Sequence, residues 1–461
     1  MPAPSSRHPS ARLFTGLGLT LIALAMLFGG ATRPDVLAPL VPRVFAVLAL
    51  TALVIRRETG IAGWSRMEKA VWLLLLAVPL VQLVPLPWTI WQTLPGRDYA
   101  HKLFAMMGVT PAQPISLAPE RTVNAFCALL PAFAAYVLAR EWDDRTQSRA
   151  FAMVLGFALF DALLAALQVT GGAGSPLRFY AVTVDDAGVG LFSNPNHLGG
   201  FLAACLPLVA LFSGTGRVKN ALPGSQKFLA AAGLFLIALG ALLSFSRAGI
   251  GLGLVAAIPA TLLLMPPGWR PAPRSIAIGA AAIIACAVLG FVQRDALVQF
   301  TQLDQEGGRT DLLPGLLRMA RDGMPFGFGM GSLDPVYRGY ESFARLGFGY
   351  LNNAHNDYLQ LVIEAGVAAL AGLALFALFG LRVGTGLWRA RRELPSQRQR
   401  TAIAAATVVA VMLVHSAVDY PLRGAAVSVL FALSCGCLAR YWQQLQDVSS
   451  GESREFGTVD R

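Results

Sequence analysis

The sequence predicts an all-α, polytopic membrane protein with about twelve transmembrane helices and one long extramembrane loop. Composition is the first indication, because the 461 residues are 55% hydrophobic and only 14% charged, against roughly 45–50% and 25% in soluble domains. The mean hydropathy of +0.57 agrees with this. The second indication is a series of apolar runs, each about as long as the ~17–25 residues that cross a bilayer as a helix.

The predicted spans follow one another along the chain with short connections between most of them. They lie at residues 13–28, 39–55, 70–86, 123–139, 150–169, 197–213, 228–245, 248–265, 275–292, 358–381, 401–418 and 424–441. This divides the chain into nine spans with short loops (1–292), a long polar loop (293–357), three further spans (358–442) and a polar tail (443–461).

The distribution of basic residues predicts the orientation in the membrane. With the N-terminus in the cytoplasm, 23 of the 37 Lys and Arg residues fall in the termini and the even-numbered connections. Cytoplasmic loops are enriched in these residues, so we read the net charge of +11 as membrane orientation and expect no nucleic-acid partner. Both termini are predicted to be cytoplasmic and the long loop to lie outside.

Cysteines and metal-ligand patterns contribute no site. All five cysteines lie in or beside apolar runs, and we find neither a disulfide framework nor the ligand spacing of a zinc or calcium site. No P-loop and no Ser-His-Asp spacing occurs in the chain. The polar groups available for chemistry on the outer face are arginines and a histidine.

Two arginines are candidates for binding an anion. Arg247 stands between two apolar runs and is flanked by Ser244 and Ser246. It is either an interfacial arginine that reaches the headgroups or a guanidinium fork aimed at phosphate. Arg309 follows two glycines in the long loop, which let the backbone turn sharply and aim the side chain, although an exposed loop arginine is the alternative reading.

The histidines are candidates for proton transfer. His355 lies among Asn and Asp residues directly before a predicted helix, where an imidazole can act as a general base near neutral pH. The alternative is that Asn356 or Asp357 caps that helix and His355 is a solvated neighbour. His197 begins another helix, and the sequence places no carboxylate near it. We interpret His415, inside a span and near Asp419, as a packed, hydrogen-bonded residue.

Several short motifs, in this order and on the same predicted face, make the chain resemble the O-antigen ligase and polymerase superfamily. They are Phe192–Gly200, Ser246–Gly249, Gly308–Asp311, Pro325–Gly329, and His355–Gln360 with Glu364–Gly366. The motifs cover residues 192–381, and the layout of twelve spans covers the whole chain. Many members have a Trp a few residues after the loop arginine, where this chain has Leu313.

The resemblance implies a metal-independent, inverting glycosyltransferase without a cofactor. Such an enzyme sits in the bacterial inner membrane, with its long periplasmic loop and its active site facing the periplasm. It moves a glycan from undecaprenyl diphosphate to an acceptor hydroxyl, here on lipid A-core. By resemblance, His355 activates the acceptor, and Arg247 and Arg309 bind the diphosphate. The supporting residues are Asn194, His197, Asp311, Asn353 and Asp357.

Three alternatives to a ligase are open. A polysaccharide polymerase would use the same chemistry with a second lipid-linked glycan as acceptor. A transporter or flippase would place charged residues near mid-bilayer on broken helices; Asp161 is the carboxylate we identify inside a run. A passive scaffold would not need arginines and a histidine gathered on one face.

Overall fold

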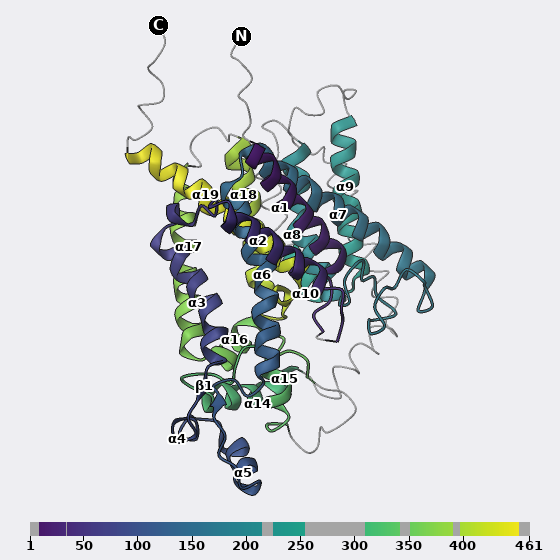
Figure 1. Cartoon of the computed structure of the whole chain (residues 1–461). Helices are drawn as coiled ribbons and strands as arrows, with labels where there is room; N and C mark the ends of the chain where they lie inside the picture. Colours follow the sequence, from purple (N-terminus) through teal and green to yellow (C-terminus); the bar gives the residue numbers. More distant parts are fainter. Residues whose placement is uncertain are drawn as a thin grey trace.

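The computed structural model describes residues 9–33, 35–213, 225–253, 309–341, 351–390 and 397–450, and these are mostly α-helical. This confirms the predicted helical class. Figure 1 shows a helical bundle in which α1 begins and α19 ends at one end, while α4, α5, α14 and α15 lie at the other. The start of the first described helix and the end of the last therefore lie on the same side of the described bundle.

The first part of the chain contributes ten elements up to α7. They are α1 (Pro9–Phe28), α2 (Leu40–Ile55), η1 (Ile61–Gly63), α3 (Arg66–Gln82), β1 (Pro85–Leu86), α4 (Trp88–Trp91), α5 (Asp98–Met106), β2 (Gln113–Pro114), α6 (Pro119–Glu141) and α7 (Asp144–Gly171). β1 and β2 form a short antiparallel pair. α3 begins with a capping box in which Ser65 and Glu68 satisfy each other's backbone N–H groups, so the start of the helix needs no further partner.

The remaining elements carry the predicted site. They are α8 (Pro195–Ser213), α9 (Ser225–Leu243), α10 (Arg247–Leu252), α14 (Arg309–Asp322), α15 (Leu333–Tyr337), α16 (Asp357–Ala365), α17 (Val367–Ala390), α18 (Gln397–His415), η5 (Pro421–Arg423) and α19 (Ala425–Ser450). The predicted short helices of the long loop correspond to α14 and α15.

The predicted single span at 358–381 is wrong, because the structure divides it into two helices. α16 ends at Ala365, and Gly366 adopts a φ of +59°. A Cβ at Gly366 would overlap the carbonyl of Pro325, so both the backbone angle and the close approach favour glycine. The position of His355 before α16 is therefore set by the packing of α16 and not by that of α17.

Five described helices are long and apolar enough to cross a membrane: α6, α7, α8, α17 and α19. Three shorter apolar helices, Leu13–Phe28, Leu40–Ile55 and Phe228–Leu243, match predicted spans as well. The predicted span 275–292, and most of 248–265, lie outside the described residues. The number twelve and the periplasmic placement of the loop remain predictions.

The core of the bundle lies where α6, α8, α18 and α19 pack together. Small residues allow close contact, and a Cβ at Gly436 of α19 would lie 2.8 Å from the carbonyl oxygen of Tyr136 on α6. Phe201, Leu208, Val408 and Leu430 are fully buried in this core. Its packing fixes the positions of α8 and α18, whose ends carry His197 and His415.

Candidate active site around His355

His355 lies on the short segment that leads into α16, and its ring meets a buried carboxylate. Its Nδ1 atom is 3.2 Å from Oδ1 of Asp419, with the histidine side chain 28% exposed and the aspartate 1% exposed. His355 has a φ of +50°, the left-handed region that non-glycine residues rarely occupy. An accessible imidazole is therefore held in one orientation by an inaccessible anion.

Asn356 is the residue that caps α16, as one of the two readings of this motif predicted. Its Oδ1 accepts the Leu359 N–H at 2.9 Å, while its Nδ2 donates to the carbonyl of Ala417 at 2.9 Å. The cap thus also ties α16 to the segment after α18. Helix capping and the pairing of His355 occur together in this structure, because Asn356 caps α16 while His355 contacts Asp419.

Asp419 is the polar centre of the site. Its Oδ1 also accepts the N–H of Tyr420 at 2.9 Å. Burial alone would raise the pKa of Asp419, but the hydrogen bond with His355 and the imidazoles of His197 and His415 hold that pKa below its ordinary value. Three of the five histidines in the chain therefore act on one carboxylate, which stays ionised at neutral pH.

Tyr420 fills the space between two of these histidines. Its ring centroid lies 5.0 Å from that of His355 and 5.0 Å from that of His197, both in edge-on geometry. Its hydroxyl accepts from Nδ2 of Asn194 at 3.4 Å and interacts with the side chain of Asn353. Tyr420 therefore joins the two predicted histidine motifs, which are distant in sequence.

His197 is a buried part of this cluster. It is 1% exposed, and within the described residues neither of its ring nitrogens has a hydrogen-bond partner. The expectation that no carboxylate lies near it is wrong, because it contributes to the electrostatic environment of Asp419. Its burial indicates a packing and electrostatic role beside His355.

The segment before His197 is fixed to α7 by buried polar side chains. Asp161 accepts the N–H of Leu191 at 2.8 Å, and Oε1 of Gln168 accepts those of Val189 and Gly190 at 2.9 and 2.8 Å. This places Asn194 beside Tyr420. Asp161, the carboxylate that we identify inside a predicted span, therefore has a structural role in holding this segment.

Arg247 is the exposed first residue of α10 and lies beside the helix that carries His197. Ser246 caps α10 by accepting the N–H of Gly249 at 3.0 Å. A Cβ at Gly249 would lie 2.6 Å from the carbonyl carbon of Gly199, and one at Gly200 would overlap Nδ1 of His415. The first turns of α8 are therefore enclosed between the start of α10 and the end of α18, which places Arg247 one helix away from the histidine cluster.

Arg309 and Asp311 lie in the first turn of α14, so they begin a helix and are not in an irregular loop. Their side chains lie outside the part that the structure describes. Further along α14, Leu316 and Met319 are buried in a small core with Ile363 of α16. Leu313, where the family resemblance leads us to expect Trp, is 46% exposed. The helix that begins with Arg309 thus packs against the helix that follows His355.

Asn353 and Asp357 are both buried, each 5% exposed. Asp357 pairs with Arg423, with 3.3 Å between Oδ1 and Nε, and Arg423 also pairs with Glu364 at 3.2 Å. Sequence reasoning missed Asp419, Tyr420 and Arg423 as site residues. The signal available was that residues 419–423, a five-residue connection between two spans, contain two charged residues.

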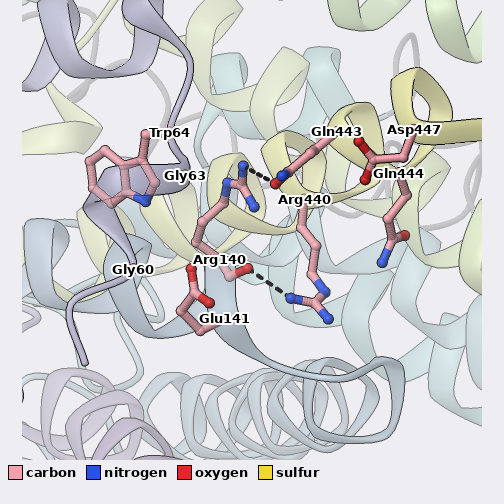
Figure 2. A pocket seen from close by; sticks show the side chains of 9 residues that line it. All are labelled: Gly60, Gly63, Trp64, Arg140, Glu141, Arg440, Gln443, Gln444 and Asp447. Carbon is pink, nitrogen blue, oxygen red and sulfur yellow. Dashed lines mark hydrogen bonds between the residues drawn. The ribbon is translucent and has the colours of Figure 1, made fainter. Parts of the chain in front are cut away.

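A second polar region lies at the other end of the bundle. It contains a cavity of about 340 Å³. The residues that line the cavity, shown in Figure 2, are Gly60, Gly63, Trp64, Arg140, Glu141, Arg440, Gln443, Gln444 and Asp447. Arg140 donates to Oε1 of Gln443 at 2.6 Å, and Arg440 donates to the carbonyl of Arg140 at 3.1 Å. These bonds join the ends of α6 and α19. None of the predicted site residues whose side chains the structure describes lines this cavity.

Among the described residues, no group of three His, Cys, Asp or Glu side chains is placed to hold a metal ion. The cluster around Asp419 contains one carboxylate in contact with one imidazole, which suits proton transfer. Metal independence itself stays a prediction.

Comparison with known proteins gives one finding. No curated protein matches the chain. A family model described as O-antigen ligase matches residues 232–376, a segment that includes Arg247, α14 and α16. The family implies a multi-pass membrane enzyme of the ligase or polymerase type that acts on lipid-linked glycans. Residues 232–376 of the chain thus match the O-antigen ligase family.

Proposed function

We propose that the protein transfers a glycan from undecaprenyl diphosphate to an acceptor hydroxyl, with lipid A-core as the acceptor. Transfer is inverting and needs no metal ion, and the site faces the periplasm from the inner membrane. His355 is the general base, and Arg247 and Arg309 bind the diphosphate. The family match supports the reaction class, and the contacts of His355 support its role.

The observation that carries this proposal is the pair formed by His355 and Asp419. When Nδ1–H donates to the buried carboxylate, Nε2 bears the lone pair that accepts a proton. The anion also stabilises the imidazolium that forms as the proton arrives. General-base assistance of this kind typically contributes about 10²–10⁴-fold to the rate.

The reaction then proceeds as one displacement. The acceptor hydroxyl gives its proton to Nε2 of His355 while its oxygen attacks the anomeric carbon of the donor glycan. The bond from that carbon to the diphosphate breaks, and the electron pair leaves with the diphosphate oxygen. Because a single attack occurs from the face opposite the leaving group, the configuration at the anomeric carbon inverts.

Negative charge increases on the diphosphate as it leaves, so fixed cations accelerate the step. Arg247 is exposed and begins α10, and Arg309 begins α14. A guanidinium group presents several N–H donors in a rigid plane and binds phosphate oxygens two at a time. The partly positive start of a helix adds to this field.

The test is transfer by the purified protein from a lipid-linked glycan of defined structure. We expect product with lipid A-core, unchanged turnover in chelator, and inversion at the new linkage. His355→Ala should abolish most of the turnover. The control is His101→Ala, which replaces a histidine of α5 that stacks on Trp88, and this variant should keep its turnover. Wild-type protein that transfers glycan neither to lipid A-core nor to a second lipid-linked glycan would overturn the proposal.

The same assay distinguishes a ligase from a polymerase. A second lipid-linked glycan is offered in place of lipid A-core, and the length of the products is measured. Chain extension with no transfer to lipid A-core would assign the polymerase reaction, with the same residues in the same roles.

A further inference from the structure

Arg423 is placed where it contacts both ends of the helix that follows His355. It is the last residue of η5, in the connection that also contains Asp419 and Tyr420. Its Nε lies 3.3 Å from Asp357 and its Nη2 lies 3.2 Å from Glu364. Burial alone would lower the pKa of Arg423, but the two carboxylates raise it above its ordinary value. The side chain is therefore a permanent cation between two anions.

The two carboxylates lie on one side of α16. Asp357 is its first residue and Glu364 its eighth, and a separation of seven residues is about two helical turns. One guanidinium can therefore hold both. Each carboxylate has a second partner: Ser416 Oγ donates to Asp357 at 3.0 Å, and Gln360 Nε2 donates to Glu364 at 2.9 Å.

This network reaches the backbone on both sides of His355. Gln360, held by Glu364, accepts the N–H of Ala354 at 3.0 Å, directly before the histidine. The N–H of Asp357 donates to the carbonyl of Ser416 at 2.8 Å, two residues after it. His355 is thus fixed from both directions by groups that lead back to Arg423.

The backbone of His355 needs such support. A φ of +50° is unfavourable for a residue with a Cβ and persists only where the surroundings determine it. The same five-residue connection supplies Asp419, which contacts the ring, and Arg423, which holds the helix. The distance between the base and its carboxylate therefore depends on how firmly α16 is held to this connection.

We propose that Arg423 is a positioning residue that keeps His355 in register with Asp419 by binding Asp357 and Glu364. It does not contact the substrate. This role rests on the proposed function, in which His355 takes the proton. Removing the cation would leave two buried carboxylates without their partner, and the start of α16 would move away from Asp419.

The first experiment compares Arg423→Gln with wild type in the transfer assay. We expect kcat to fall about 10–100-fold, because a shift of ~1 Å at a reacting group has an effect of that order. Donor binding should change less than about 3-fold, since the arginines proposed to hold the diphosphate are elsewhere. The matched control is Arg338→Gln, which removes an exposed arginine paired with Asp334 at 3.2 Å and should leave kcat unchanged.

Combining variants tests whether Arg423 acts through the histidine pair. Asp419→Asn should already lose the benefit of correct positioning, so adding Arg423→Gln should lower kcat little further. Multiplicative losses would show an independent effect and overturn the proposal. If Arg423→Gln does not fold, Arg423→Lys decides, because an ammonium keeps the charge but cannot hold both carboxylates in the same geometry. Full kcat in Arg423→Lys would then overturn the proposal.

A spectroscopic measurement separates this inference from the proposed function. The chain has five histidines, so ¹⁵N-histidine labelling gives few signals, and His355→Gln identifies that of His355. In wild type we expect the neutral ring to carry its proton on Nδ1. In Arg423→Gln the signal should shift toward a mixture of both neutral forms. An unchanged signal would refute the positioning role even if transfer is confirmed, and a shifted signal would support it even if the reaction proves different.

Discussion

Replacing Asp419 by Asn is the sharpest test of the site, because it removes one charge and almost no volume. The carboxylate is 1% exposed and 3.2 Å from His355. An amide oxygen at the Oδ1 position can still accept from Nδ1–H of His355 and from the N–H of Tyr420, but it has no negative charge to stabilise the imidazolium that the proposed reaction forms. The fold should tolerate the change, since the amide oxygen can still accept the N–H of Tyr420.

The size of the effect follows from the charge that is lost. As His355 takes the acceptor proton, an imidazolium forms whose charge centre lies about 4 Å from that of Asp419, worth roughly 4 kcal/mol at an effective dielectric constant near 20. At ~1.4 kcal/mol per factor of ten, the full loss is about 10³-fold in kcat. We expect a decrease of about 10²–10³-fold, because water partly screens the half-buried histidine.

The assay is turnover at saturating lipid-linked donor, with donor binding measured separately. Asp334→Asn is the control, since this aspartate of α15 pairs with Arg338 and Arg121 and has no contact with His355 among the described residues. Turnover of Asp419→Asn within about 3-fold of wild type would refute the reasoning. It would mean that the carboxylate only fills space beside the histidine.

Four further predictions concern the base, the two arginines, the membrane orientation and the titration of Asp357. His355→Gln should lose turnover while donor binding persists; near wild-type turnover with an unchanged pH–rate profile would remove His355 from the mechanism. Arg247→Lys and Arg309→Lys should each impair donor use with every acceptor offered, because an ammonium lacks the two-pronged contact; a defect with one acceptor only would contradict diphosphate binding. A periplasm-active reporter fused after Gly339 should be active, and an inactive fusion would reverse the predicted orientation. Burial raises the pKa of Asp357 to about 6, above its value near 3.9 in an unfolded chain. At a pH between these two pKa values, only the folded protein binds this proton. The free energy of unfolding therefore decreases as pH rises from about 4 to 6, by ~3 kcal/mol at most. The unfolding temperature of wild type relative to Asp357→Asn should fall across that range, and a constant difference would argue against the raised pKa.

The helices could be predicted from hydrophobicity, while their breaks could not. The run at 358–381 is apolar enough to suggest one span, yet the structure breaks it at Gly366. Glu364 was the overlooked signal, because a carboxylate inside an apolar run needs a partner. Asp161 is therefore not the only carboxylate within a predicted run. Glu364 marks the place where the helix ends and a polar network begins.

The candidate site could be predicted in part, because its residues lie in recognisable short motifs. His355 and Asn194 were identified, and both lie in the cluster around Tyr420. Asp419 could not be linked to His355, since 64 residues separate them and their contact depends on how α18 returns the chain beside α16. Hydrophobic periodicity contains no information about that pairing. It indicates which residues face a core, not which connections meet.

The placement of helix ends explains why these particular groups can serve one reaction. α8 and α10 begin side by side, and the partly positive start of a helix attracts anions. α18 ends at His415, and Asp419 follows it within four residues, so the negative end of a helix and a buried anion lie together beside His355. In the reaction that we propose, this field favours a diphosphate near Arg247 and an imidazolium at His355. These are the two charges that a displacement creates at once, one on the leaving group and one on the base, so a rigid bundle with these ends fixed stabilises the transition state more than the bound substrates.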